Sequence, residues 1–292
     1  TVPVPVYEDF APVIGTRLTL FVQPGKVESI YRAFFDEYCR KDALFNKNPL
    51  LFLNKLTKLR LYVDSWRSMT FSVSRNIQTY PDGLTCEDGV DLSVDLKEMR
   101  SGVSKDYQQK VICRRYTKPI LYNRSACCSR YGPNTTFDSK RMLMQIVVPE
   151  VDDLYGEDPI TSGTLYSFLP TQIRLTVPLV CHVPFKLDGS REFVDPQNQN
   201  AWFRHSSDSF ASMVKEVLLD LSRRINEDIV HYVPGMNKYL FEFTNSKVRE
   251  LLTPEFSSQT YLALPIFKSV EKSFLPDSEV FCFPVDDDIP EP

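Results

Sequence analysis

One stretch of the chain reads Thr164-Leu165-Tyr166-Ser167-Phe168-Leu169-Pro170-Thr171 and continues, five residues later, as Val177-Pro178-Leu179-Val180-Cys181-His182-Val183-Pro184-Phe185-Lys186-Leu187-Asp188-Gly189-Ser190-Arg191-Glu192. Residues 163–169 and 175–185 have the strongest strand patterns in the second half of the chain. The Asp-Gly-Ser triplet that follows them is typical of a turn. Such a turn can hold the long, permanently charged side chain of Arg191 toward a neighbouring domain.

Helical and strand patterns alternate on both sides of this stretch. Apolar residues at helical spacing predict helices over residues 27–40 and 210–225, the latter capped by Ser207 or Asp208. A shorter helix is predicted over residues 49–56, with Asn48 as its N-cap and Pro49 at its first position. Period-two alternation or β-forming composition predicts strands over residues 17–22, 59–63, 69–73, 107–116 and 142–148.

The order of these elements decides the fold class. Helices and strands are interleaved without a regular βαβ rhythm, which favours an α+β fold with mixed sheets and packed helices over a doubly wound sheet. Pro149, Asp152, Asp153, Gly156 and Pro159 mark residues 150–162 as a boundary or long loop. We therefore expect residues 26–160 to form linker helices with a β-rich subdomain and residues 161–292 to form an α/β subdomain that carries the Arg191 turn.

The quoted stretch resembles the sacsin-like branch of a superfamily of ATPases that includes gyrase, heat-shock-90-type chaperones, histidine kinases and MutL. In that branch an FLP strand precedes a segment of the form GLP-x-H-V-x-x-x-F-x-L-x-x-x-R, and a W-N element then introduces a helix. This chain has Phe168-Leu169-Pro170, then the segment ending at Arg191, then Ala201-Trp202 and the predicted helix 210–225. Gly15-Thr16-Arg17-Leu18-Thr19-Leu20 is similar to the strand that ends the nucleotide-binding domain of the superfamily. The resemblance therefore implies that residues 1–25 are the end of such a domain.

The resemblance implies roles for three residues. Arg191 would sense the γ-phosphate of ATP, because a guanidinium matches a pair of phosphate oxygens and stabilises the charge that develops on them. Lys186 would add positive potential, and Thr16 would help to bind adenine. The heat-shock relatives have glutamine four residues after the arginine, where this chain has Asp195. The alternative interpretation is that Ser190-Arg191-Glu192 opens a short helix and carries a surface ion pair.

Motifs that are missing from the sequence limit the function. The chain has no E-x-x-x-N helix for magnesium, no D-x-G-x-G adenine motif and no glycine-rich lid, nor a P-loop or a nucleophile elbow. We therefore expect a transducer or middle region that follows a nucleotide-binding domain in a longer protein. ATP and Mg²⁺ would be bound mainly by that preceding domain, and a protein client and homodimer formation would be further interactions of the relatives.

The composition indicates where the protein is located and which partners it lacks, but it does not indicate a reaction. The net charge is -4, so the chain as a whole has no attraction for nucleic acid or anionic lipid. Seven cysteines without a C-x-x-C pair indicate neither a disulfide framework nor a zinc site, and three scattered histidines do not suggest a metal cluster. With no apolar run of about 20 residues, no contact with a membrane is expected. The expected location is the reducing cytoplasm.

A second hypothesis comes from the charge pattern in the middle of the chain. Nine lysines and arginines lie between Ser104 and Arg141, against only Asp106 and Asp138, and four tyrosines are interleaved with them. Basic residues combined with aromatic residues can bind nucleic acid through phosphate contacts and stacking. They can equally form the solvated face of a sheet. This stretch would make the chain a non-catalytic module that binds nucleic acid or an acidic partner.

Overall fold

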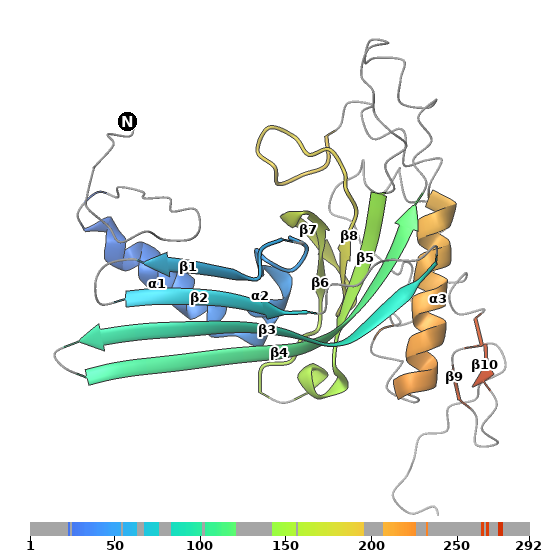
Figure 1. Cartoon of the computed structure of the whole chain (residues 1–292), viewed down its shortest axis with the longest axis horizontal. Helices are drawn as coiled ribbons and strands as arrows, with labels where there is room; N and C mark the ends of the chain where they lie inside the picture. Colours follow the sequence, from blue (N-terminus) through green and yellow to red (C-terminus); the bar gives the residue numbers. More distant parts are fainter. Residues whose placement is uncertain are drawn as a thin grey trace, which may run out of the picture.

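The computed structural model describes residues 23, 25–53, 55–62, 67–75, 83–100, 103–120, 142–155, 157–195, 207–225, 232, 264–265, 267–268 and 274–276. An eight-stranded mixed sheet runs through this part of the chain in the order β1-β2-β3-β4-β5-β8-β6-β7 (Figure 1). All neighbouring strands are antiparallel except β6 and β8, which are parallel. The strands are β1 Lys58–Tyr62, β2 Arg67–Ser74, β3 Thr85–Arg100, β4 Val103–Ile120, β5 Met142–Pro149, β6 Gly163–Ser167, β7 Leu169–Leu175 and β8 Val180–His182.

The hairpin of β3 and β4 is much longer than the other strands, and with β1 and β2 it forms an arm that extends away from α3 (Figure 1). The register of this hairpin shifts between Glu87 and Val90. Gly89 lies inside that bulge at φ 68°, a left-handed conformation that glycine adopts without steric cost. A bulge bends a strand and increases its twist, so this position is where the arm departs from the rest of the sheet.

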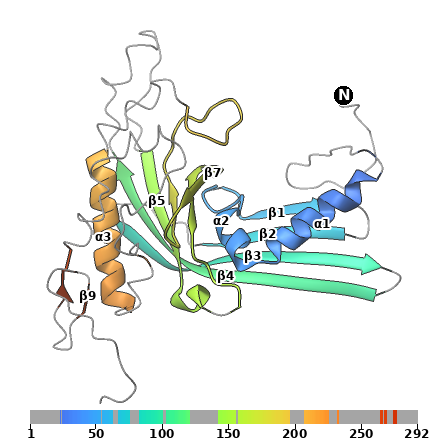
Figure 2. The ribbon, with the colours of Figure 1, turned by 180° about the vertical axis from the view of Figure 1, so that it is seen from behind.

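Helices cover opposite faces of the sheet in its two halves. Helix α1 (Lys26–Tyr38) and helix α2 (Lys41–Asn46) lie along the arm, whereas α3 (Ser207–Ile225) lies along the other half (Figure 2). On β5, Val147 belongs to the core that contains Tyr38 of α1 and the buried apolar residues of α2, and Ile146 and Val148 belong to the core that contains those of α3. Because successive side chains of a strand point to opposite faces, the two cores lie on opposite sides of the same sheet.

Several sequence-based predictions are confirmed. The structure has the mixed sheet with packed helices expected of an α+β fold. The helices predicted over residues 27–40 and 210–225 correspond to α1 and α3. Strands are present at 58–62, 67–74 and 142–149, as expected. The sheet joins strands from the segments 26–160 and 161–292.

The helix predicted over residues 49–56 is wrong. Residues 49–52 and 55 form turns, and the helix in this region is α2, which ends at Asn46. Asn48 does accept a hydrogen bond from the Leu50 amide at 2.9 Å, as an N-cap would, but the chain does not continue into a helix. The Arg75 guanidinium instead donates hydrogen bonds to the carbonyl oxygens of Leu50, Leu51, Leu53 and Leu56.

The strand predicted over residues 175–185 is also shorter than expected. Residues 176–178 form a bend that separates β7 from the three-residue strand β8, and residues 183–186 belong to no strand. The strand predicted over residues 17–22 lies outside the described residues. The tail beyond residue 261 is described only in part, and there β9 (Phe267–Lys268) pairs antiparallel with β10 (Phe274–Leu275).

Candidate functional site

The arginine-bearing loop, residues 183–195, leaves the sheet at the carboxyl end of β8. Strand β6 runs parallel to β8, with Leu165 opposite Cys181 and Tyr166 opposite His182. The turn that follows β6 therefore lies at the same end of the sheet as the loop that follows β8. The Ser167 hydroxyl donates to the Phe185 carbonyl oxygen at 2.6 Å and joins this turn to the base of the loop.

The loop is closed on itself by backbone pairing. Leu187 and Val194 form an antiparallel bridge, and the Asp195 amide donates to the Lys186 carbonyl oxygen at 3.0 Å. Beyond the bridge, the Gln172 amide of β7 donates to the Glu192 carbonyl oxygen at 3.0 Å. These bonds fix the loop to the edge of the sheet.

The tip of the loop is the predicted Asp-Gly-Ser turn, closed by a bond of 3.1 Å from the Arg191 amide to the Asp188 carbonyl oxygen. The Asp188 carboxylate accepts from the Ser190 hydroxyl at 2.7 Å, and Glu192 donates its amide to the Ser190 oxygen at 3.2 Å. The hydrogen bond from the Ser190 hydroxyl, together with bonds from the backbone amides of residues 191–193, lowers the pKa of Asp188 from its ordinary value. The turn is thus organised by a charged carboxylate.

Arg191 projects from this turn in a restricted conformation. Its φ of 62° is in the left-handed region, which costs a residue with a side chain about 1–2 kcal/mol, so the surrounding bonds must hold it there. The residue is exposed, and no described acidic residue forms an ion pair with its guanidinium. Residues 191–193 are not helical, so the alternative of a short helix with a surface ion pair does not describe this segment.

The turn between β6 and β7 has a second strained residue, Phe168, at φ 65°. The Phe168 amide donates to His182 Nδ1 at 3.3 Å, and the Phe168 ring lies 4.8 Å from the His182 ring between centroids. The Phe52 ring stacks against the same imidazole at 5.1 Å. Burial lowers the pKa of His182 from 6.5 to about 4, so this histidine is neutral at pH 7 and its Nδ1 is an acceptor.

Of the three site residues predicted from the sequence, two belong to this loop. Arg191 lies at its tip, and Lys186 lies exposed at its base, on the other side of the Leu187–Val194 bridge. Thr16 lies outside the described residues. The predictions missed the contact of Phe168 with His182, although Phe168 and His182 both stand inside the stretch that carries the resemblance. The parallel pairing of β6 and β8, which brings them together, leaves no signal in the sequence.

The basic stretch that carries the second hypothesis is largely paired with acidic residues where it is described. Four of its cations are bound to carboxylates: Lys110 to Asp91 at 3.1 Å, Arg114 to Asp88 at 2.6 Å and Glu150 at 3.1 Å, Arg115 to Glu87, and Lys118 to Glu216 at 2.5 Å. The Arg115–Glu87 pair is buried. This part of the stretch therefore presents little uncompensated positive charge, and residues 121–141 lie outside the described part.

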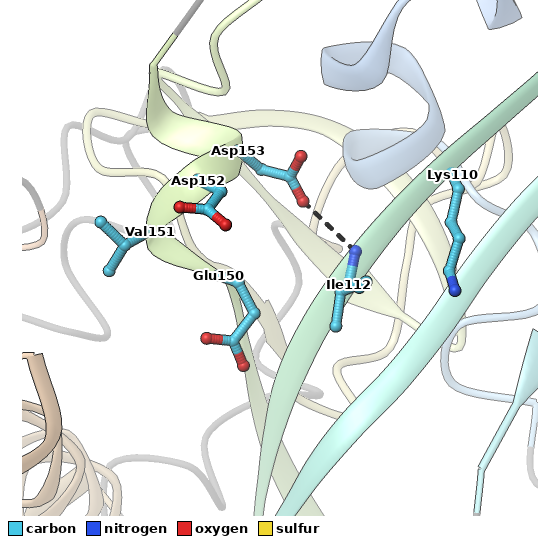
Figure 3. Close-up of a pocket in the computed structure, with 6 residues that line it drawn as sticks. All are labelled: Lys110, Ile112, Glu150, Val151, Asp152 and Asp153. Atoms are coloured by element: carbon cyan, nitrogen blue, oxygen red, sulfur yellow. Dashed lines mark hydrogen bonds between the residues drawn. The ribbon is translucent and has the colours of Figure 1, made fainter.

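An open pocket of about 340 Å³ lies between β4 and the 3-10 helix η2 (Val151–Leu154) (Figure 3). Its lining residues are Lys110, Ile112, Glu150, Val151, Asp152 and Asp153. Asp153 accepts from the Ile112 amide at 3.3 Å and pairs with Lys41 at 2.6 Å, so this carboxylate fastens η2 to both β4 and α2. The pocket lies near the start of β6, at the other end of that strand from the arginine-bearing loop.

An exposed guanidinium suits a terminal phosphate, but no cluster of three or more His, Cys, Asp or Glu residues within the described ranges could hold a metal ion. No helix in the described part has the length and apolar character required to cross a membrane.

Comparisons with known proteins neither support nor oppose an assignment. The chain matches no family model, no curated protein and no solved structure.

Proposed function

We propose that this chain is the transducer or middle region of an ATP-dependent protein of the sacsin-like or heat-shock-90-like type. In this proposal Arg191 reaches the γ-phosphate of an ATP molecule held by the preceding nucleotide-binding domain. The observation that carries the proposal is the position of Arg191, which is exposed and forms no ion pair with any acidic residue in the described part of the chain. Its backbone is fixed in a left-handed turn at the end of two parallel strands.

The conformation of the loop fits this role. An arginine that contributes to phosphate chemistry must be in place before the reaction, because the cost of ordering it would otherwise reduce the gain from its charge. The Leu187–Val194 bridge and the hydrogen bonds of Asp188 order the loop in advance. A surface arginine with only a solvating role would not require a strained backbone.

The fold supplies a route by which contact at Arg191 affects the rest of the chain. The loop is attached to β8 and, through the Gln172–Glu192 and Ser167–Phe185 hydrogen bonds, to β7 and β6. If a bound phosphate displaced the loop, these hydrogen bonds would shift the ends of all three strands together. This coupling is what a region that converts nucleotide binding into rearrangement requires.

The test is ATP turnover in the intact protein, where this chain follows the sequence that naturally precedes it. Arg191→Ala is expected to lower the turnover number by about 10³-fold or more, the range measured when an arginine that stabilises phosphoryl transfer is removed. Arg174→Ala is the matched control, since this arginine lies on the neighbouring strand β7 and donates to Thr164 at 3.2 Å. Undiminished hydrolysis in Arg191→Ala would remove the assigned role.

The second hypothesis, binding of nucleic acid or an acidic partner by residues 104–141, predicts different behaviour. Its affinity would fall steeply with salt and would not depend on Arg191. The ion pairs of Lys110, Arg114, Arg115 and Lys118 lend it no support.

A further inference from the structure

Exposed apolar side chains surround the arginine-bearing loop. Phe168 is 54% exposed, Leu169 is 44% exposed and Phe193 is 38% exposed. Phe168 forms the turn after β6, and Leu169 is the first residue of β7. Phe193 is in the loop, next to Glu192, whose carbonyl oxygen bonds to β7. A cation and three apolar side chains thus occupy the same end of the sheet.

Backbone strain coincides with this surface. Among the described residues, Phe168 and Arg191 are the two non-glycine residues with positive φ, at 65° and 62°. A bulky aromatic residue is an outlier in this region, and such outliers gather at sites where the strain serves a purpose. One strained residue is the cation Arg191, which stands beside the carboxylates of Asp188 and Glu192, and the other carries the most exposed of the three apolar side chains.

Phe168 is held rigidly although its ring is half exposed. Its amide is bonded to His182, and its ring contacts an imidazole that is itself stacked on Phe52. Phe52 and His182 are both buried, at 2% and 3% exposed, so one side of the Phe168 ring rests on the core. Its other side is available, and a prearranged aromatic group loses little entropy on binding.

We propose that Phe168, with Leu169 and Phe193, is the apolar anchor of the surface through which Arg191 meets the nucleotide-binding domain. The inference rests on the proposed function, and it adds that the partner domain presents an apolar recess beside its bound triphosphate. The anchor fixes the distance between the two domains, and Arg191 reads the phosphate only when the anchor is seated.

Two other occupants fit the surface less well. A second copy of this chain related by a two-fold axis that passes close to Arg191 would bring the two Arg191 side chains together, which is unfavourable between like charges. Varied protein clients are usually bound by adaptable, methionine-rich surfaces, whereas Phe168 is fixed and residues 163–195 contain no methionine. A rigid anchor beside a cation fits one defined anionic partner.

The experiment uses the intact protein with a photo-crosslinking residue, Leu169→benzoylphenylalanine, in the presence and absence of a non-hydrolysable ATP analogue. The expected result is a crosslink to the preceding nucleotide-binding domain that forms when the analogue is present. A crosslink to a second copy, seen as a covalent dimer, would overturn the inference. The absence of any nucleotide-dependent crosslink would overturn it as well.

Phe168→Gly then tests the anchor without threatening the fold. Glycine adopts φ 65° freely, so this variant removes the ring while it relieves the backbone. It is expected to reduce the crosslink yield at limiting analogue concentration about tenfold. The matched control is Phe34→Gly, because Phe34 is 43% exposed and lies on α1, away from this surface. A melting curve checks that this variant is folded. If glycine destabilises α1, Phe34→Ser replaces it. An unchanged yield in Phe168→Gly contradicts the anchor role.

Arg191→Ala separates this inference from the proposed function. If both are correct, Arg191→Ala loses turnover and keeps most of the crosslink. If turnover is unaffected while the nucleotide-dependent crosslink still requires Phe168, the anchor stands and the γ-phosphate role fails. If Arg191→Ala loses turnover but the crosslink does not respond to Phe168→Gly, the γ-phosphate role stands and the anchor fails.

Discussion

Replacement of His182 by asparagine is expected to remove a large part of the acid sensitivity of the fold. His182 is 3% exposed, and its Nδ1 accepts the Phe168 amide hydrogen bond, so the folded protein needs the neutral imidazole. Burial is the main cause of its low pKa, and a hydrogen bond to the backbone of Tyr166 acts weakly in the opposite direction. Asparagine can offer an acceptor oxygen near the position of Nδ1 but cannot be protonated in this range.

The magnitude follows from the difference between the pKa values of the two states. The unfolded chain binds a proton with a pKa of 6.5 and the folded chain with a pKa of about 4. The unfolded state therefore binds more protons as the pH falls below 6.5, and stability is lost until the pH reaches about 4. Between pH 7 and pH 4.5 the loss due to this one group is roughly 2.5 kcal/mol, since each pKa unit corresponds to about 1.4 kcal/mol.

Urea unfolding followed by far-ultraviolet circular dichroism at pH 7 and pH 4.5 measures this loss. Wild type is expected to lose roughly 2.5 kcal/mol more than His182→Asn over that interval. The carboxylates that also titrate there are common to both proteins and cancel in the comparison. Phe52→Leu is the matched control, because it removes a ring from the same stack but keeps the histidine, and it should retain the acid sensitivity. Equal losses in wild type and His182→Asn would refute the reasoning.

Two further predictions concern packing and the attachment of α3. In Gly163→Ala the new methyl group would lie 1.6 Å from the Leu179 carbonyl oxygen, a backbone atom that cannot rotate away, so we expect a loss of at least about 3 kcal/mol in unfolding free energy. Gly189→Ala meets nothing within 4 Å and should change stability little, and equal melting temperatures for the two variants would contradict the prediction. Tyr116→Phe removes a hydrogen bond of 2.7 Å from β4 to the Asp220 carboxylate of α3, and urea unfolding is expected to register a loss of about 1.5 kcal/mol. The same loss in an Asp220→Ala background, where the acceptor oxygens are absent, would show that the bond is not its cause.

Local sequence patterns correctly predicted the helices and strands that bury one face in a core. In α3 the apolar residues Met213, Val217 and Leu221 recur at helical spacing, and all three are buried against the sheet. In β2, Met69, Phe71 and Val73 alternate with polar residues and face the other core. Burial of one face explains both patterns, so the sequence carried enough information to predict them.

The prediction of a helix over residues 49–56 failed because a distant residue, and not the local pattern, decides the conformation there. Its capping residue Asn48 and the following Pro49 are local signals, but the conformation is decided by Arg75, more than 20 positions away in the sequence from Leu50–Leu53. The guanidinium bonds to the Leu53 and Leu56 carbonyl oxygens, groups that a continuing helix would pair with later amides. A tertiary hydrogen bond therefore overrides the capping signal, and no window of local sequence contains it.

In the candidate site, as in the fold, the features formed by neighbouring residues could be predicted and those formed by distant residues could not. The turn of Asp188, Gly189 and Ser190 could be predicted because the side chains that form it are adjacent in the sequence. The left-handed conformations of Phe168 and Arg191 could not, because both residue types normally avoid positive φ and are held there by contacts with His182 and Asp188. Strain of this kind is visible only when the partners are in place.

The arginine-bearing loop follows a strand that packs in both cores, so a displacement of the loop would reach both halves of the sheet. Strands β6 and β8 belong to both cores: Leu165 and Cys181 pack on the side of α3, whereas Tyr166 and Val180 pack on the side of α1 and α2. The Tyr166 hydroxyl also donates to the Asn48 carbonyl oxygen at 3.4 Å, in the turns that follow α2. Closely packed cores transmit displacement rather than absorb it. A force on Arg191 and Phe168 would therefore reach the arm and α3 through the same pair of strands, as the proposed transducer role requires.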